Sequence, residues 1–196
     1  MSKAPSHNRD THVLYEISVK SLKWEFDNGQ VYDVSHLLEN GRANYILMED
    51  LIAQFSGLAP NSQGGKSDLR DDAKMNFEVK SYPDVELHPG ANDWFHTASS
   101  STFGANNHGP AVKQLLKSGD YSGALKLCKE KGYDKNDFYV YVNSAQFRIE
   151  IPIRYIILPK QEVLGLLSSD DPRLISRREI LSLATHTVQL DAVGLD

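Results

Sequence analysis

The chain has 196 residues, about 40% of them hydrophobic and 24% charged, a composition typical of a soluble globular protein with its own core. It contains no run of 18 apolar residues, which excludes a membrane-spanning helix, and its single cysteine excludes an internal disulfide. Residues 1–12 are polar and lack the apolar segment of a secretory signal. We therefore expect a flexible polar leader, one domain over residues 13–196 and a cytoplasmic location.

The net charge of −5 opposes nonspecific attraction to nucleic acid, but the charges are unevenly distributed. Residues 110–160 contain nine Lys or Arg against five Asp or Glu, a local net charge of +4. A basic middle within an acidic chain can still contact DNA phosphates, with a weaker nonspecific affinity.

Two amphipathic segments in the first third of the chain predict helices. In residues 13–26, Leu14, Ile17 and Leu22 fall on one helical face. Residues 42–56 show a clearer helical pattern, with apolar side chains at the three- and four-residue spacing of one face. These apolar positions are Tyr45, Met48, Leu51, Ile52 and Phe55.

Glu49 lies just beside the apolar face of the second predicted helix. One interpretation is a solvated charge at the boundary of that face. The other is a carboxylate that reaches from the helix toward a metal site, which requires further ligands nearby.

The stretch GGKSDLRDDAKMNFEVK, residues 64–80, predicts a β-hairpin. We expect its strands at residues 67–71 and 76–82, joined by a turn near residues 72–75. The preceding Gly64-Gly65 pair is too short to cradle a nucleotide, and the chain has neither a P-loop nor a G-x-S-x-G motif, so no organic cofactor is expected.

Strand alternation sorts the hairpin residues into two faces. Leu69, Phe77 and Val79 fall on the apolar face, and Asp68, Glu78 and Lys80 fall on the polar one. Asp68 would lie opposite residues 78–80, with directly opposed Cβ atoms about 5 Å apart. Asp71 has the wrong parity and Asp72 lies in the turn, so Asp68 is the better candidate for a shared site with Glu78.

Residues 83–110 form a long segment rich in Gly, Asn, Ser, Thr, His and Pro, and loops of this length in compact domains are usually functional or disordered. Two interpretations stay open: an ordered surface loop, or a loop that reads DNA, because Asn can pair bidentately with adenine. We expect base or phosphate contacts somewhere in residues 93–113. The candidate DNA-binding residues are Ser99, Ser100, Ser101, Asn106, Asn107, His108 and Lys113.

The second half of the chain alternates helix and strand patterns, and no internal repeat is present. The strongest strand signals are FYVYV at 138–142 and FRIEIPIRYIIL at 147–158, joined as a hairpin. Together the patterns predict one mixed α/β domain. The predicted helices span residues 110–117, 121–131, 160–167 and 176–184.

Asp68, followed after nine residues by Glu78-Val79-Lys80, resembles the D…(D/E)xK signature of the PD-(D/E)xK nuclease superfamily, which includes many type II restriction endonucleases. The upstream helix with Glu49 is also similar to that family, in which such a helix often supplies an extra carboxylate. One departure is Ser67, which stands where the family name implies proline. The resemblance covers residues 42–82 and implies a restriction-endonuclease-like core, a central mixed β-sheet flanked by helices.

The resemblance further implies Mg²⁺-dependent hydrolysis of double-stranded DNA at a specific sequence, typically by a homodimer. Asp68, Glu78 and the main-chain carbonyl of Val79 would be metal ligands. Lys80 would orient the attacking water or stabilise charge on the phosphate. Glu49 would hold a second metal or a metal-bound water.

Two alternatives stay open. A repair or junction-cleaving nuclease of the same superfamily would use the same centre on a different DNA structure. In a non-catalytic binding or assembly module, Asp68, Glu78 and Lys80 would form only a surface salt-bridge cluster.

Overall fold

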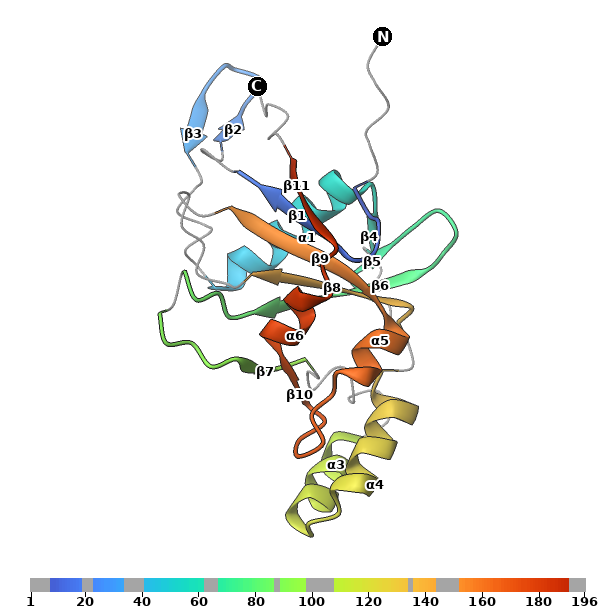
Figure 1. Cartoon of the computed structure of the whole chain (residues 1–196). Helices are drawn as coiled ribbons and strands as arrows, with labels where there is room; N and C mark the ends of the chain where they lie inside the picture. Colours follow the sequence, from blue (N-terminus) through green and yellow to red (C-terminus); the bar gives the residue numbers. More distant parts are fainter. Residues whose placement is uncertain are drawn as a thin grey trace.

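The architecture is that of a mixed α/β protein with a central β-sheet between helices (Figure 1). The computed structural model describes residues 8–18, 23–33, 41–61, 67–86, 89–97, 108–133, 136–143 and 152–190. Within these residues, no helix is both long and apolar enough to cross a membrane.

The central sheet has seven strands in the order β11-β1-β9-β8-β6-β5-β4. The β1–β11 and β6–β8 pairs are parallel and the remaining neighbours are antiparallel, so the sheet is mixed. The strands are β1 (Val13–Ile17), β4 (Ala59–Pro60), β5 (Leu69–Arg70), β6 (Asn76–Tyr82), β8 (Phe138–Asn143), β9 (Ile153–Pro159) and β11 (His186–Leu190).

The prediction of a helix over residues 13–26 is wrong. Val13–Ile17 forms strand β1, which lies between β9 and β11. Val13, Tyr15 and Ile17 are buried and alternate with less buried residues, so the period of two prevails over the weaker helical spacing. Farther on, Lys23–Glu25 and Val31–Asp33 pair as the separate antiparallel hairpin β2–β3.

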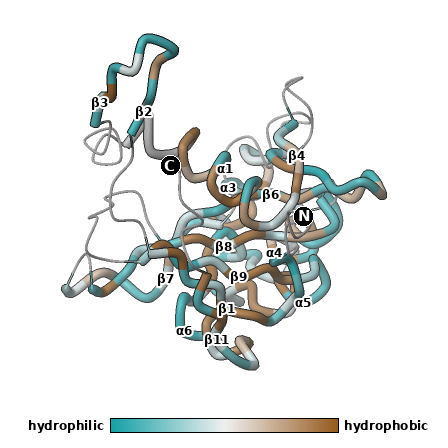
Figure 2. The backbone as a smooth tube through the Cα atoms, turned by 90° about the horizontal axis from the view of Figure 1, so that it is seen from above, coloured by the Kyte–Doolittle hydropathy of each residue, from teal (hydrophilic) through white to brown (hydrophobic). Residues whose placement is uncertain are grey.

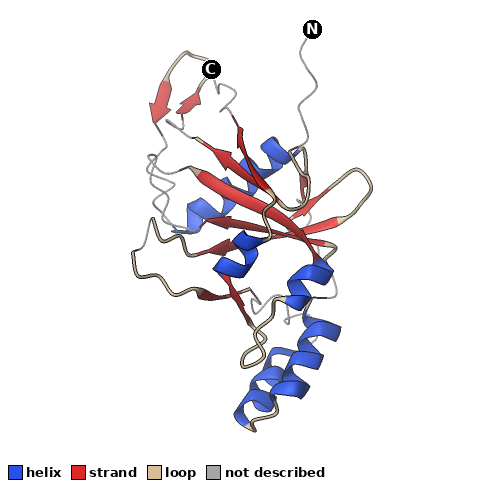
Figure 3. Cartoon of the chain, in the orientation of Figure 1, coloured by secondary structure: helices blue, strands red, loops and turns tan. Residues whose placement is uncertain are grey.

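Helices cover both faces of the sheet (Figure 3). Helix α1 (Gly41–Ser56) packs Met48, Leu51 and Ile52 against one face, as the spacing predicts. The other face is covered by the helices α3 (His108–Lys117), α4 (Tyr121–Leu127), α5 (Lys160–Gly165) and α6 (Arg177–Ser182), together with the π-helical turn η2 (Cys128–Gly132). Figure 2 shows hydrophobic residues concentrated along β1, β8 and β9 between these layers.

Smaller contacts complete the fold. Strands β7 (Trp94–His96) and β10 (Leu174–Ser176) pair antiparallel below the central sheet. Ser176 caps α6 by accepting a hydrogen bond from the backbone N–H of Glu179 (3.2 Å). Near the start of the described chain, the side chain of Asn8 donates to the carbonyl of Phe55 (3.0 Å), which fastens this segment to the end of α1.

Candidate active site on strand β6

The predicted hairpin is present, with a first strand shorter than expected. β5 has two residues, and its register pairs Leu69 with Phe77 and Arg70 with Asn76. The turn is closed by Asp71, whose Oδ1 accepts a hydrogen bond from the backbone N–H of Met75 (2.8 Å). Leu69 and Phe77 are buried in the core beneath α1, so the predicted parity of the hairpin is confirmed.

Asp68 lies where the chain that enters β5 meets the edge of β6. Its backbone N–H still donates to the carbonyl of Phe77 (3.1 Å), but the next bond along β6 is made by its side chain: Oδ2 accepts from the N–H of Val79 (2.8 Å). The side chain thus replaces a strand at this edge of β6. Because the N–H and C=O of one strand residue point to the same edge, the carbonyl of Val79 faces the same side as Asp68.

Glu78 and Lys80 form a buried ion pair on β6. Their side chains are only 6% and 10% exposed, and Lys80 Nζ lies 2.6 Å from Glu78 Oε1. The parallel ladder places Tyr139 beside Glu78 and Tyr141 beside Lys80. Burying a lysine and a carboxylate carries a desolvation penalty that their attraction often does not repay, so such a pair is poorly explained by stability alone.

Glu49 belongs to the same group of charges. The pKa of its carboxyl is raised from 4.5 to about 7, first by burial and then by the negative charges of Asp68, Glu78 and Asp50, with an opposing effect of Lys80. The helix α1 therefore brings Glu49 within electrostatic range of the hairpin residues. Glu49 is thus coupled electrostatically to the three predicted residues of the hairpin.

Asn136 is a member of this group that the sequence did not indicate. It is 1% exposed, and its Nδ2 donates to Glu78 Oε2 (3.3 Å). The neighbouring Asp137 holds it in place, because Asp137 Oδ2 accepts from the N–H of Asn76 (2.8 Å) and its own N–H donates to the carbonyl of Asn76 (2.9 Å). Asn136 is 58 residues from Glu78 along the chain, so no local pattern connects them.

The donor set fits a hard divalent cation in part. Glu78 pairs with Lys80 and Asp68 bonds to the next main-chain N–H along β6, and Mg²⁺ is commonly held by one or two carboxylates together with waters and phosphate oxygens. Within the described part of the chain, however, no three His, Cys, Asp or Glu side chains form a complete metal-binding group. Any cation here would depend on Asp68, Glu78 and a main-chain oxygen, completed by water or substrate.

The predicted DNA-binding residues are only partly described. Ser99, Ser100, Ser101, Asn106 and Asn107 lie outside the described residues. His108 is the first residue of α3 and is half-buried, and Lys113 is exposed on the same helix.

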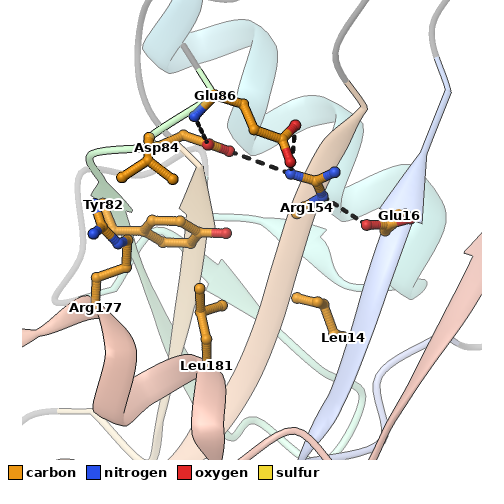
Figure 4. Close-up of a pocket in the computed structure, with 9 residues that line it drawn as sticks. Leu14, Glu16, Tyr82, Asp84, Glu86, Arg154, Arg177 and Leu181 are labelled. Carbon is orange, nitrogen blue, oxygen red and sulfur yellow. Dashed lines mark hydrogen bonds and ion pairs between the residues drawn. The ribbon is translucent and has the colours of Figure 1, made fainter. Parts of the chain in front are cut away.

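A separate pocket of about 280 Å³ opens at the C-terminal end of β6, and its lining includes neither Glu78 nor Lys80 (Figure 4). Its charges are largely satisfied internally: Arg154 lies 2.6 Å from Glu16, 3.0 Å from Glu86 and 3.6 Å from Asp84. We therefore place the candidate chemistry at the Glu78–Lys80 pair. The pocket is lined by Leu14, Glu16, Tyr82, Asp84, Val85, Glu86, Arg154, Arg177 and Leu181.

Searches for related proteins give no relative from which to transfer a function. No family model matches the chain, and neither a curated protein nor a solved structure matches it.

Proposed function

We propose that this protein is a Mg²⁺-dependent endonuclease of the restriction type, which hydrolyses phosphodiester bonds in double-stranded DNA. The observation that carries the proposal is the buried Glu78–Lys80 pair, beside an aspartate that occupies the edge of β6. A buried lysine paired with one carboxylate, with a second carboxylate bonded to the same strand, suits the binding of a phosphate group and a water molecule. A restriction-endonuclease-like core is part of the proposal, supported by the mixed sheet and by α1 packed beside the hairpin.

Each side chain has a distinct task in the proposed reaction. Lys80 donates from Nζ to the attacking water or to a non-bridging phosphate oxygen, which stabilises the negative charge that develops during attack. Asp68 supplies a carboxylate at the edge of β6, where it bonds to the N–H of Val79, and Glu78 supplies one from β6 itself. A bound Mg²⁺ would supply Lewis-acid polarisation of the phosphate and a lowered pKa of a bound water.

Glu49 offers a group that can accept a proton near neutral pH. Its pKa of about 7, raised first by burial, means that it exchanges a proton close to the pH at which the enzyme would work. In this position Glu49 can take the proton released from the attacking water or add a carboxylate oxygen to a second cation.

The proposed substrate, double-stranded DNA, bears on how the protein would assemble. Cutting both strands needs two reaction centres or two successive events, and a homodimer on a palindromic site matches its own two-fold symmetry to that of the DNA. The residues that read bases are proposed to lie within residues 93–113, which include exposed Lys113.

A plasmid-nicking assay with purified protein tests the proposal. With Mg²⁺ the parent should nick or linearise supercoiled plasmid, and EDTA should abolish the activity. Asp68→Ala and Lys80→Ala should each reduce the rate by a factor of about 100 or more, the size of effect seen when one group that stabilises developing charge is removed. Asp72→Ala is the matched control, because Asp72 is an exposed aspartate in the turn of the same hairpin. This variant should cut DNA as fast as the parent.

The same assay decides between the functions. If Lys80→Ala and Asp68→Ala nick as fast as the parent, the centre is not catalytic and a binding module is the better interpretation. Discrete fragments from a large DNA identify sequence-specific cleavage, and sequencing their ends gives the site. Cutting that follows branches or flaps instead identifies a repair-type nuclease.

A further inference from the structure

Each oxygen atom of the Glu78 carboxylate accepts a hydrogen bond. Oε1 accepts from Lys80 Nζ at 2.6 Å and Oε2 accepts from Asn136 Nδ2 at 3.3 Å. Lys80 lies on β6 and Asn136 lies just before β8. The two donors also differ in nature, since one is a charged side chain that can turn to substrate and the other is a neutral, buried amide.

Asn136 is held in a fixed position by its burial and by the hydrogen bonds of its neighbour. It is 1% exposed and precedes β8, and its neighbour Asp137 is tied to the first residue of β6 by two hydrogen bonds of 2.8 and 2.9 Å. The carbonyl of Asp137 also accepts from the N–H of Lys160 (2.9 Å), which fastens the same point to the start of α5. The amide therefore has little freedom to follow Glu78 if the carboxylate rotates.

Lys80 cannot by itself fix the carboxylate during the proposed reaction. When its Nζ donates to a phosphate or a water, its bond to Glu78 weakens, and among the described residues the Asn136 bond is the one that still orients the carboxylate. An outer hydrogen-bond partner that orients a ligand commonly changes metal affinity by about 10- to 100-fold when it is removed.

We propose that Asn136 is a positioning residue that orients Glu78 toward a divalent cation at the β6 edge. This inference rests on the proposed function for the identity of the site. It adds to the site a residue outside the hairpin motif. Tight binding of the cation would then depend on the pairing of β6 with β8.

The test is Mn²⁺ binding to the full chain, measured by titration calorimetry without DNA. Asn136→Leu keeps the approximate size of the side chain and removes the donor, and it should weaken Mn²⁺ binding by about tenfold or more. Asn143→Leu is the matched control. Asn143 is equally buried at 1% exposed and donates to Asp84 and to the Pro152 carbonyl (3.0 Å each), away from Glu78, so its loss should leave Mn²⁺ affinity within twofold of the parent.

The outcomes separate this inference from the proposed function. Equal Mn²⁺ affinity of Asn136→Leu and the parent overturns the positioning role, whatever the nuclease activity. Weaker binding in Asn136→Leu, together with a parent that binds Mn²⁺ but cuts no DNA, supports the positioning role and overturns the nuclease. A parent that binds no Mn²⁺ overturns both. If Asn136→Leu does not fold, Asn136→Ser, which leaves room for a water, is measured against the same thresholds.

Discussion

Glu49 is a residue whose charge opposes folding over part of the pH range. Its pKa rises from 4.5 to about 7 in the folded chain, first through burial and then through Asp68 and Glu78. Between these two pH values the folded chain holds more protons than the unfolded chain, so the contribution of Glu49 to stability falls as the pH rises from 4.5 to 7.

Glu49→Gln should therefore be more stable than the parent at pH 8, by about 1 kcal/mol after allowance for solvent screening of a half-buried group. The advantage should shrink toward zero near pH 4.5, where Glu49 is protonated in the folded chain. Urea unfolding of both proteins at pH 5 and pH 8 measures this difference. An advantage of the same size at both pH values would show that the charge is not its cause.

At the scale of elements, α1 holds its place through a narrow apolar stripe. Ile52 is fully buried in the core on one side of the helix, whereas Ile46 is 66% exposed. Ile52→Ala should lower the free energy of unfolding by about 2–5 kcal/mol, because it removes buried methylene groups and leaves a cavity. Ile46→Ala, the same exchange on the same helix, should change it by less than about 0.5 kcal/mol. Urea midpoints with equal slopes measure both, and a similar loss in the two variants would contradict the burial pattern.

The elements that the sequence predicted well are those with strong local periodicity. The helix expected at residues 42–56 is α1 (Gly41–Ser56), and the strands expected at 76–82 and 138–142 are β6 and β8. The segment 13–26 was mispredicted because β1 is stabilised by β9 and β11, which lie more than 130 residues away in sequence. A helical pattern of three residues was too weak to outweigh that pairing.

The same distinction applies to the candidate site. Asp68, Glu78 and Lys80 lie on one hairpin, so strand parity alone was enough to bring them together. Asn136 joins them through the parallel pairing of β6 with β8, which no local pattern in either strand specifies. The sequence leaves Glu49 with two interpretations, and the structure adds that its carboxyl is electrostatically coupled to Asp68 and Glu78.

At the scale of the whole molecule, the reactivity of the Cys128 thiol measures whether the helical layer, formed by α3, α4, η2, α5 and α6, is packed against the sheet. Cys128 is the first residue of η2 and is fully buried in the core against the sheet, and burial raises the pKa of its thiol to about 12. A thiol-specific reagent such as Ellman's reagent should therefore react with the native protein only as fast as this layer opens, and immediately in denaturant.

Ser122→Cys in the Cys128→Ser background is the matched control, because Ser122 is exposed on α4 and its cysteine should react at once. Reaction followed by absorbance at increasing urea concentrations should coincide with loss of circular dichroism. Immediate reaction of Cys128 in the native protein would show that the helical layer is loosely packed.

The parallel pairing of β6 with β8 has a consequence for how the molecule is made. The bond between Glu78 and Asn136 spans 58 residues, and closing a loop of that length costs roughly 3–4 kcal/mol of chain entropy. The β5–β6 hairpin and α1 are local and can form earlier, whereas contacts of this range form late. A nascent chain whose β8 has not yet left the ribosome would contain Asp68 and Glu78 without the contacts that β8 and Asn136 add to the candidate site. The order of synthesis would thus delay the final arrangement of the candidate site until β8 has been made.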